Sequence, residues 1–303
     1  MHPTDILIIG TGSMGLGLAG ILASHSGIPV RVYSRLPADT TRTIVLTGRY
    51  SCSVPVRGVS DPTSSTSGTL LIACVKAYDL APVLKIVYQQ AIQAPALVLL
   101  QNGFFIKDFA QETFDALGIE KRPELVRMIT SMGMNRTGPV TVEVAGLGET
   151  ALEAGETGSW LAELLVHCGL PAYPAATMGD KEIEKAVANS VINPLTAVYR
   201  VPNGALLCEH AFRERMHLLL QEDALVLQHL GYQVEVTVLF ENIRKIIDNT
   251  AGNRSSMLQD VEAGRPTEIA FLNGFIIRKA GEMGIPVPAN QAVYEQVIRS
   301  TTG

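Results

Sequence analysis

The chain has 303 residues, of which 47% are apolar and 17% are charged, and its net charge is −5. This length supports two domains with their own cores, and the composition is that of a folded enzyme, not of a disordered or fibrous chain. A negative balance without any basic run excludes nucleic acid as a partner, and no apolar run is long enough to span a bilayer. The opening residues, MHPTDILIIG, lack the pattern of a signal peptide, so we expect a cytoplasmic protein without a membrane partner.

The first predicted unit is a strand, a glycine turn and a helix. Asp5–Ile9 is aliphatic and β-branched, and residues 16–24 have helical composition. The turn between them consists of Gly10, Thr11, Gly12, Ser13, Met14 and Gly15. Gly10 permits a tight turn, Gly12 lets the backbone approach a pyrophosphate, and Gly15 lets the helix pack closely on the strand. Because the helix N-terminus also offers free N–H groups, this order predicts a dinucleotide-binding site.

The second predicted strand, residues 29–33, ends where the adenosine ribose of a dinucleotide should lie. Enzymes that use NAD place an Asp or Glu there, whereas this chain has Ser34 and Arg35, with its first acid at Asp39. A guanidinium group suits the 2′-phosphate of NADP, so Arg35 predicts NADP(H) as the cofactor. The alternative is that Arg35 is a solvated surface arginine.

Two further apolar runs, residues 69–75 and 96–100, are predicted strands that lead into Lys76 and Asn102. Ligands of open α/β sheets bind outside the carboxyl ends of the strands, so both side chains are expected at the cofactor site. Helices are expected at residues 79–93, 105–117 and 159–168, and strands at 125–131 and 140–144. This alternation predicts an α/β fold with a parallel, doubly wound Rossmann-type sheet.

Strand patterns nearly vanish beyond residues 171–174, which we interpret as a domain boundary. The chain then divides into a Rossmann-type NADP-binding domain, residues 1–174, and an all-helical substrate and catalytic domain, residues 175–303. The expected helices are residues 180–199, 209–230, 238–249, 256–263, 268–283 and 290–299. Pro194 lies inside the first of them and removes a backbone donor, which predicts a kink or a break.

Lys185, Asn189 and Asn193 follow one another at a spacing of four residues, which places them on one face of a helix. The residues between them are small or apolar, so this polar stripe needs partners. One interpretation is an interior amide network whose lysine reaches the surface. The other is a reductase site, in which Lys185 donates a proton to a carbonyl oxygen that accepts a hydride, while the two amides bind the substrate.

Ser256 and Glu268 are weaker candidates in the same half of the chain. Ser255 and Ser256 stand at a predicted helix start, where a hydroxyl can hold a substrate carboxylate, and the alternative is that Ser256 only caps the helix. Glu268 falls in the first turn of the next predicted helix, where a carboxylate is favourable in any case. Six scattered histidines and four scattered cysteines provide no ligand spacing, so we expect no metal.

Seven motifs, in order, resemble those of the ketopantoate reductases (2-dehydropantoate 2-reductases) over nearly the whole chain. They are GTGSMG, Lys76-Ala77, Gln101-Asn102-Gly103, KxxxNxxxNPLTA from Lys185, Pro202-Asn203-Gly204, SSMLQD from Ser255, and TEI with the later Asn273-Gly274. The resemblance implies reduction of ketopantoate to pantoate with NADPH, on the pathway to pantothenate and coenzyme A. It implies that Lys185 is the general acid and that Asn189, Asn193, Asn203 and Ser256 contact the substrate. It also implies that Asn102 and Glu268 lie against cofactor and substrate.

The chain departs from the family pattern at Ala270, where an aspartate is common, and at residues 132–134, which are less polar than usual. These departures leave open an NADP-dependent reductase of another small 2-keto acid on the same two-domain fold. A non-catalytic NADPH-binding sensor is the alternative from another class of protein. The oligomeric state is left open, a homodimer included.

Overall fold

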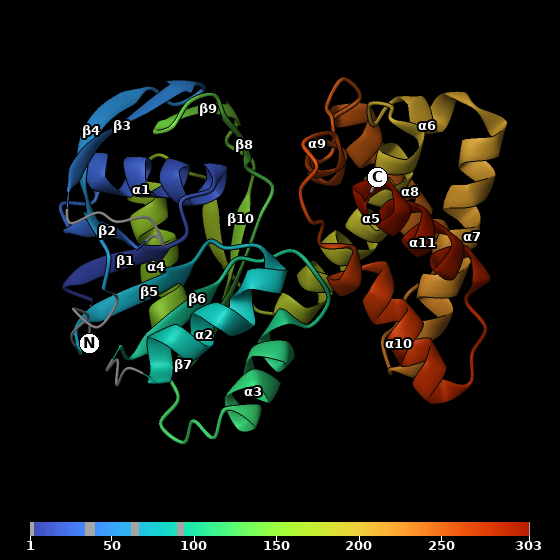
Figure 1. Cartoon of the computed structure of the whole chain (residues 1–303), viewed down its shortest axis with the longest axis horizontal. Coiled ribbons are helices and arrows are strands. Elements are labelled where there is room, and N and C mark those ends of the chain that lie inside the picture. Colours follow the sequence, from blue (N-terminus) through green and yellow to red (C-terminus); the bar gives the residue numbers. More distant parts are fainter. Residues whose placement is uncertain (1–2, 34–39, 62–66, 90–93, 303) are drawn as a thin grey trace. The chain divides into compact units, whose positions relative to one another are not determined.

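The computed structural model describes residues 3–33, 40–61, 67–89 and 94–302, so Arg35 lies outside the described residues. The chain divides into two compact units (Figure 1). The first covers Met1–Gln101 and Phe105–Lys181, and the second covers Asn102–Phe104 and Glu182–Gly303. The expected assignment of function to residues 1–174 and 175–303 stays a prediction beside this structural division.

Eleven strands form one sheet within the described part of the first unit. They are β1 (Asp5–Ile9), β2 (Val30–Tyr33), β3 (Thr41–Gly48), β4 (Cys52–Val59), β5 (Thr69–Ala73), β6 (Ala96–Leu99), β7 (Glu124–Thr130), β8 (Gly133–Arg136), β9 (Thr141–Gly146), β10 (Thr150–Glu153) and β11 (Ala172–Ala175). Their spatial order is β11-β10-β7-β6-β5-β1-β2-β4-β3-β9-β8. The central neighbours from β7 to β4 are parallel, whereas β10 on β7, β3 on β4 and β8 on β9 are antiparallel. The predicted parallel sheet is therefore correct at the centre and mixed towards both edges.

The register of the central strands brings their carboxyl ends to one edge. Ile9 at the end of β1 pairs with Ala73 at the end of β5, and Ala73 pairs with Leu99 at the end of β6. The segments that follow these strands, which start at Gly10, Cys74 and Leu100, therefore leave the sheet side by side. This is the edge at which open α/β sheets bind their ligands.

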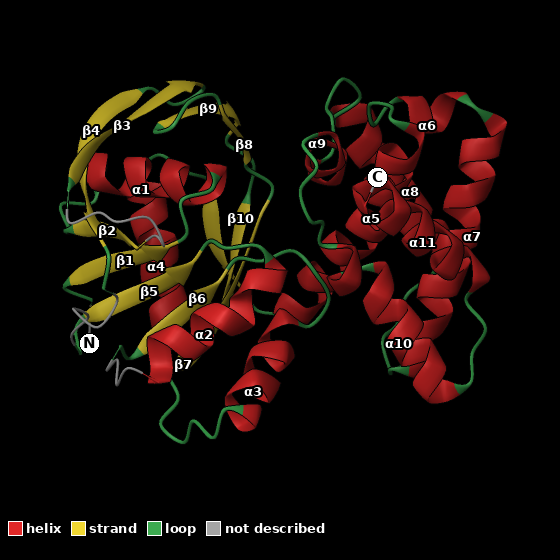
Figure 2. Ribbon diagram, viewed as in Figure 1, coloured by secondary structure: helices red, strands yellow, loops and turns green. Residues whose placement is uncertain are grey.

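Helices cover both faces of the sheet, as Figure 2 shows. They are α1 (Ser13–His25), the short 3₁₀ helix η2 (Ala77–Asp79), α2 (Leu80–Gln89), α3 (Ile106–Ala116) and α4 (Glu156–His167). Alternate residues of the central strands, such as Ile6 and Ile8, share one core with α1 and α4. The strands β2, β3, β4, β8 and β9 also contact α1, so the outer part of the sheet wraps around that helix.

The described residues of the second unit form helices joined by loops, without strands (Figure 2). Its helices are α5 (Met178–Tyr199), which begins in the first unit, α6 (Ala205–Cys208), α7 (His210–His229), α8 (Val236–Asn249), α9 (Ser256–Glu262), η3 (Ile269–Phe271), α10 (Asn273–Met283) and α11 (Pro288–Thr302). Among the described helices, none has a stretch long and apolar enough to cross a bilayer.

The structure differs from the sequence-based expectation for these elements in three places. The strands β3, β4, β8, β10 and β11 were not predicted, and β11 occupies the stretch interpreted as a domain boundary. The helix expected over residues 268–283 is interrupted at Leu272, whose φ and ψ are −108° and −99°. Phe104 N donates to Phe271 O at 3.1 Å, so this carbonyl is taken by another segment at the interruption. Of the kink or break expected at Pro194, the break is absent: α5 continues through this residue.

Candidate active site

The glycine turn after β1 has the geometry that a pyrophosphate site needs. Gly10 has a φ of +116°, and a Cβ atom there would lie 2.8 Å from Cys74 O. A Cβ atom on Gly15 would lie 2.1 Å from Gly10 O, so α1 can approach the strand only without a side chain at this position. Around Gly12, by contrast, a Cβ atom would meet nothing within 4 Å. The turn is therefore packed on its inner side and open on its outer side, where a phosphate would lie.

The N-terminus of α1 faces the same turn. Gly12 is its N-cap residue, no side chain caps the helix, and its first turn holds no acidic residue. The early N–H groups of a helix have no partners within it and carry the positive end of the helix dipole. Gly10, Thr11, Gly12, Ser13, Met14 and Gly15 together fit the pyrophosphate of a dinucleotide.

Lys76 and Gln101 follow the neighbouring strands at the same edge of the first unit. Lys76 is half-buried and precedes η2. Gln101 is 3% exposed, and its Nε2 donates to Ala73 O at 2.8 Å, which links the ends of β5 and β6. Arg127 on β7 donates to Gln101 O at 2.7 Å and to Leu99 O at 2.8 Å. The carboxyl end of β6 is thus held by two buried side chains just before Asn102.

Sequence reasoning missed Arg136, which contacts the glycine turn from β8. Its Nη1 donates to Thr11 O at 3.1 Å, and its other nitrogens donate to the carbonyls of Gly138 and Pro139. The guanidinium group therefore joins the β8–β9 connection to the turn and places a positive charge beside it. The only sequence signal would have been a basic residue near the short Gly138-Pro139 turn, which is too common to predict such a contact.

The second unit carries the predicted lysine and amide stripe on α5. Lys185 and Asn189 are half-buried, and Asn193 is 7% exposed. Within the described residues, the side chains of Asn189 and Asn193 form no hydrogen bond, either with each other or with a neighbour. The interior amide network considered as an alternative is therefore not what these two asparagines form. Their donors and acceptors remain for a ligand.

Asn102 and Glu268, which are 166 residues apart, come together in the second unit. Asn102 Nδ2 donates to Glu268 Oε2 at 3.1 Å. Asn102 is half-buried and Glu268 is 6% exposed. Phe104 fixes the same segment, because its ring stacks on Phe275 with the ring centroids 5.2 Å apart. Two predicted site residues are thus positioned by one local set of contacts.

Ser255 and Ser256 have different surroundings at the start of α9. Ser255 is the N-cap residue: it is 7% exposed, and its Oγ accepts from Leu258 N at 3.1 Å. Ser255 Oγ also lies 2.7 Å from Thr196 Oγ1, which ties α9 to the helix that carries the stripe. Ser256 is exposed, so the alternative in which Ser256 caps the helix is wrong. Its hydroxyl is free to contact a ligand.

Asn203 is mostly occupied by contacts with the segment that follows α8. Its Nδ2 donates to Thr250 Oγ1 at 3.0 Å, and its backbone N donates to Asn253 O at 2.9 Å. The side-chain Oδ1 is buried without a hydrogen-bond partner in the described part of the chain. Asn203 therefore ties the loop before α6 to the segment between α8 and α9, and its contact with the substrate stays a prediction.

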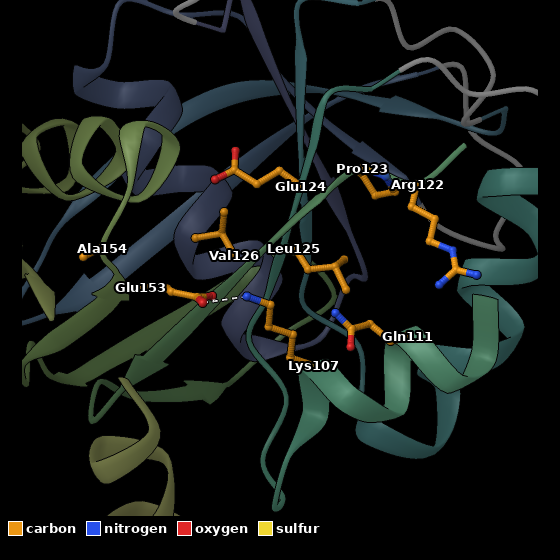
Figure 3. A pocket seen from close by; sticks show the side chains of 9 residues that line it. All are labelled: Lys107, Gln111, Arg122, Pro123, Glu124, Leu125, Val126, Glu153 and Ala154. Carbon is orange, nitrogen blue, oxygen red and sulfur yellow. Dashed lines mark hydrogen bonds and ion pairs between the residues drawn. The ribbon is translucent and has the colours of Figure 1, made fainter. Parts of the chain in front are cut away.

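A pocket of about 260 Å³ in the first unit contains none of the predicted site residues (Figure 3). It is lined by Lys107, Gln111, Arg122, Pro123, Glu124, Leu125, Val126, Glu153 and Ala154. Its charged groups are largely satisfied within the protein, since Lys107 pairs with Glu153 at 2.6 Å and Arg122 pairs with Asp115 at 2.5 Å. No group of three His, Cys, Asp or Glu side chains suited to a metal ion occurs in the described residues.

Family models match both halves of the chain. The model described as ketopantoate reductase PanE/ApbA matches residues 6–157, and the one described as ketopantoate reductase PanE/ApbA C terminal matches residues 178–300. The 2-dehydropantoate 2-reductase of Archaeoglobus fulgidus is 30% identical over 307 residues, covering 98% of each chain. That of Shigella flexneri is 30% identical over 300 residues, covering 97% of this chain and 94% of the relative.

Solved structures share the fold over nearly the full length. A PanE/ApbA family ketopantoate reductase from Ralstonia eutropha has a TM-score of 0.85 at 26% identity and covers 98% of both chains. A D-mandelate dehydrogenase, solved with NADH and anilino(oxo)acetate, has a TM-score of 0.83 at 21% identity and also covers 98% of both chains. At this low identity, the second likeness concerns the fold alone.

Proposed function

The chain belongs to the ketopantoate reductase family, and from this premise we propose that it reduces 2-dehydropantoate to pantoate with NADPH, using Lys185 as the general acid. The observation that carries the residue assignment is the stripe on α5. Lys185, Asn189 and Asn193 share one face of α5 among mostly small and apolar neighbours, and the two amides have no side-chain partner among the described residues. Polar groups in such surroundings are expected to have a partner, and here a keto acid would provide it.

The bound nicotinamide would supply the hydride chemistry of this reaction. As the carbonyl carbon is reduced, the carbonyl oxygen gains negative charge and takes a proton to become a hydroxyl. The Lys185 ammonium group holds that proton and stabilises the developing charge. Asn189 and Asn193 offer both amide donors and acceptors to the polar groups of the substrate. The exposed Ser256 hydroxyl would hold the carboxylate, and Asn102 with Glu268 would orient cofactor and substrate.

NADPH rather than NADH is proposed on the basis of Arg35, which follows β2 where an acidic residue would otherwise bind the ribose. The residues proposed to hold the rest of the cofactor are the glycine turn, Gly10 to Gly15, and Lys76 at the end of β5. The packed and open sides of the turn support this assignment. The free state of all four cysteines supports the cytoplasm as the compartment. A homodimer remains a prediction.

Another 2-keto acid is the second candidate substrate. The two departures from the family pattern differ in how close they lie to the proposed site. Met132 and Met134 are 7% and 9% exposed and belong to the core around α1, so this departure is accounted for by packing. Ala270 is exposed and stands two residues after Glu268, which makes it the departure closest to the proposed site along the chain. The chain is an oxidoreductase of this family, which leaves the non-catalytic sensor without support.

The test is a comparison of 2-keto acids at saturating NADPH. We expect the highest kcat/KM for 2-dehydropantoate, with a small aliphatic and an aromatic 2-keto acid as comparators. A comparator that exceeds 2-dehydropantoate by about ten-fold, equivalent to about 1.4 kcal/mol in transition-state stabilisation, would reassign the substrate while keeping the reaction type. Repeating the assay of the best substrate with NADH in place of NADPH shows which of the two cofactors the enzyme prefers.

A further inference from the structure

Pro194 leaves one backbone carbonyl of α5 without its helical partner. In an α-helix the N–H of residue i donates to the carbonyl of residue i−4, and proline has no N–H, so the affected carbonyl is that of Ser190. Asn273 Nδ2, from the start of α10, donates to Ser190 O at 2.9 Å. Ser190 and Asn273 are both 0% exposed, so water does not reach this carbonyl from bulk solvent. A side chain from another helix thus replaces the missing backbone donor.

The same asparagine begins a closed ring of buried hydrogen bonds. Asn273 Nδ2 also donates to Asn290 Oδ1 at 2.9 Å, and Asn290 Nδ2 donates to Asp223 Oδ1 at 3.0 Å. Asp223 Oδ2 lies 2.6 Å from Ser190 Oγ, and the Ser190 carbonyl accepts from Asn273, so the ring closes at Ser190. Ser190, Asp223, Asn273 and Asn290 are each 0% exposed. These four hydrogen bonds therefore connect α5, α7, α10 and α11.

The orientation of the Asn273 amide shows what this residue contributes. Its two N–H groups face two acceptor oxygens, whereas its Oδ1 is buried without a partner among the described residues. The opposite orientation would place Oδ1 against both acceptors. A buried acceptor without a partner is unfavourable. Asn273 therefore makes its two donor hydrogen bonds although its own Oδ1 stays without one.

The pKa of the Asp223 carboxyl group in this ring is raised to about 7. Burial is the largest cause and the nearby Glu222 carboxylate also raises the pKa, whereas the hydrogen bonds from Ser190 and Asn290 lower it. Glu222 itself accepts from Ala289 N and Asn290 N, both at 2.8 Å, at the start of α11. The described contacts of Asp223 include no cation. A neutral Asp223 can donate to Ser190 Oγ, and Ser190 Oγ can then donate to Val187 O at 2.8 Å.

We propose that Asn273, Asn290 and Asp223 are positioning residues that fix the rotation of α5 at Ser190 and Pro194, and thereby aim its lysine and amide stripe at the substrate. Ser190 follows Asn189 directly, and Pro194 follows Asn193 directly. A change in the hydrogen bonding of the Ser190 carbonyl is therefore transmitted to both amides within one helical turn. The proposal rests on the proposed function of the stripe, but its structural part is testable without substrate.

The test is a double-mutant cycle between Asn273→Ala and Pro194→Ala. Asn273→Ala removes the donor to Ser190 O, and Pro194→Ala restores the backbone N–H that can take its place. We expect Asn273→Ala to lower kcat/KM for the keto acid by about ten- to a hundred-fold, in line with the effect of a small misplacement of reacting groups. NADPH affinity should change by less than about two-fold, and the double variant should recover part of the loss. Gln291→Ala, an exposed amide next to Asn290 on α11, is the matched control and should change neither.

Hydrogen exchange of the α5 backbone, measured by mass spectrometry on the same variants, separates this proposal from the proposed function. Faster exchange around residues 190–194 in Asn273→Ala, reversed in the double variant, supports the positioning role even if the wild type reduces no keto acid. Unchanged exchange and unchanged kcat/KM in a folded Asn273→Ala variant overturn it. If Asn273→Ala does not fold, recovery of folding in the double variant supports the proposal, and a double variant that also fails to fold contradicts it.

Discussion

At the level of single residues, Ser255 and Ser256 show how two adjacent hydroxyl groups can have separate roles. Ser255 is buried and caps α9, whereas Ser256 is exposed. Removing a capping side chain costs about 1 kcal/mol, so Ser255→Ala should lower the melting temperature. Ser256→Ala should instead raise KM for the keto acid by about ten-fold, with little change in melting temperature. A Ser256 variant that melts early but binds the keto acid normally would show that its hydroxyl does not hold the substrate.

Arg35 lies outside the described residues, and its role is tested by cofactor binding. Arg35→Ala should weaken NADPH by about ten- to a hundred-fold, because a charge-assisted hydrogen bond to the 2′-phosphate is worth roughly 1.5–3 kcal/mol. NADH lacks that phosphate, so its affinity should stay the same. Titration of both nucleotides measures this, with Arg42→Ala, an exposed arginine on β3, as control. Equal losses for the two nucleotides would mean that Arg35 has a structural role.

At the level of elements, the turn between β1 and α1 provides a matched pair of substitutions. Gly12→Ala adds a methyl group where nothing in the protein lies within 4 Å. Its melting temperature should therefore be unchanged, while NADPH affinity falls by about ten-fold or more if a pyrophosphate occupies that space. Gly15→Ala places a methyl group 2.1 Å from Gly10 O, so it should destabilise the fold by about 1–3 kcal/mol. Normal NADPH binding by Gly12→Ala would remove the turn from the cofactor site.

The elements that the sequence predicted correctly are those whose signal is local. The strands β1, β5 and β6 are apolar runs, and the glycine turn is recognisable because its spacing occurs directly between a predicted strand and a predicted helix. The strands β3 and β4 were missed because they bury alternate residues only, such as Ile44 and Leu46 of β3, and because β4 contains Pro55. Their burial depends on α1, which packs against them from elsewhere in the chain.

The candidate site also has features that the local sequence predicts and features that depend on contacts between distant segments. The spacing of Lys185, Asn189 and Asn193 could be predicted, since helical periodicity is a property of the local sequence. The contact of Asn273 with Ser190, across 83 residues, could not be predicted without the packing of α10 against α5. The division of roles between Ser255 and Ser256 also required the structure, because it depends on where α9 begins.

At the level of the whole molecule, Asp223 links the free energy of unfolding to pH. Its pKa is about 7 in the folded chain and 3.8 in the reference state, so the folded state holds this proton more tightly than the unfolded state. Below about pH 4 both states are protonated and the group adds no pH dependence. As the pH rises from about 4 to about 7, the unfolded state loses its proton first, and the unfolding free energy falls by on the order of 4 kcal/mol. Above that range the contribution is constant.

Asp223→Asn should remove this contribution, because an amide can keep both hydrogen bonds without ionising. Chemical denaturation at about pH 5 and about pH 8 measures the difference, and the variant should gain on the wild type at the higher pH. Asp248→Asn, at an exposed position on α8, is the control. If the wild type and Asp223→Asn lose the same stability between the two values, Asp223 is ionised in the folded chain throughout this range.

The central claim is that this oxidoreductase reduces 2-dehydropantoate with Lys185 as its general acid. The most direct test follows NADPH consumption and pantoate formation together in the wild type, in Lys185→Ala and in Lys245→Ala, an exposed lysine on α8. We predict one pantoate for each NADPH in the wild type and in Lys245→Ala, and a kcat lower by roughly 10² to 10⁴ in a folded Lys185→Ala variant. A Lys185→Ala variant that keeps more than about half of the wild-type kcat, or a wild type that forms no pantoate, would contradict the account.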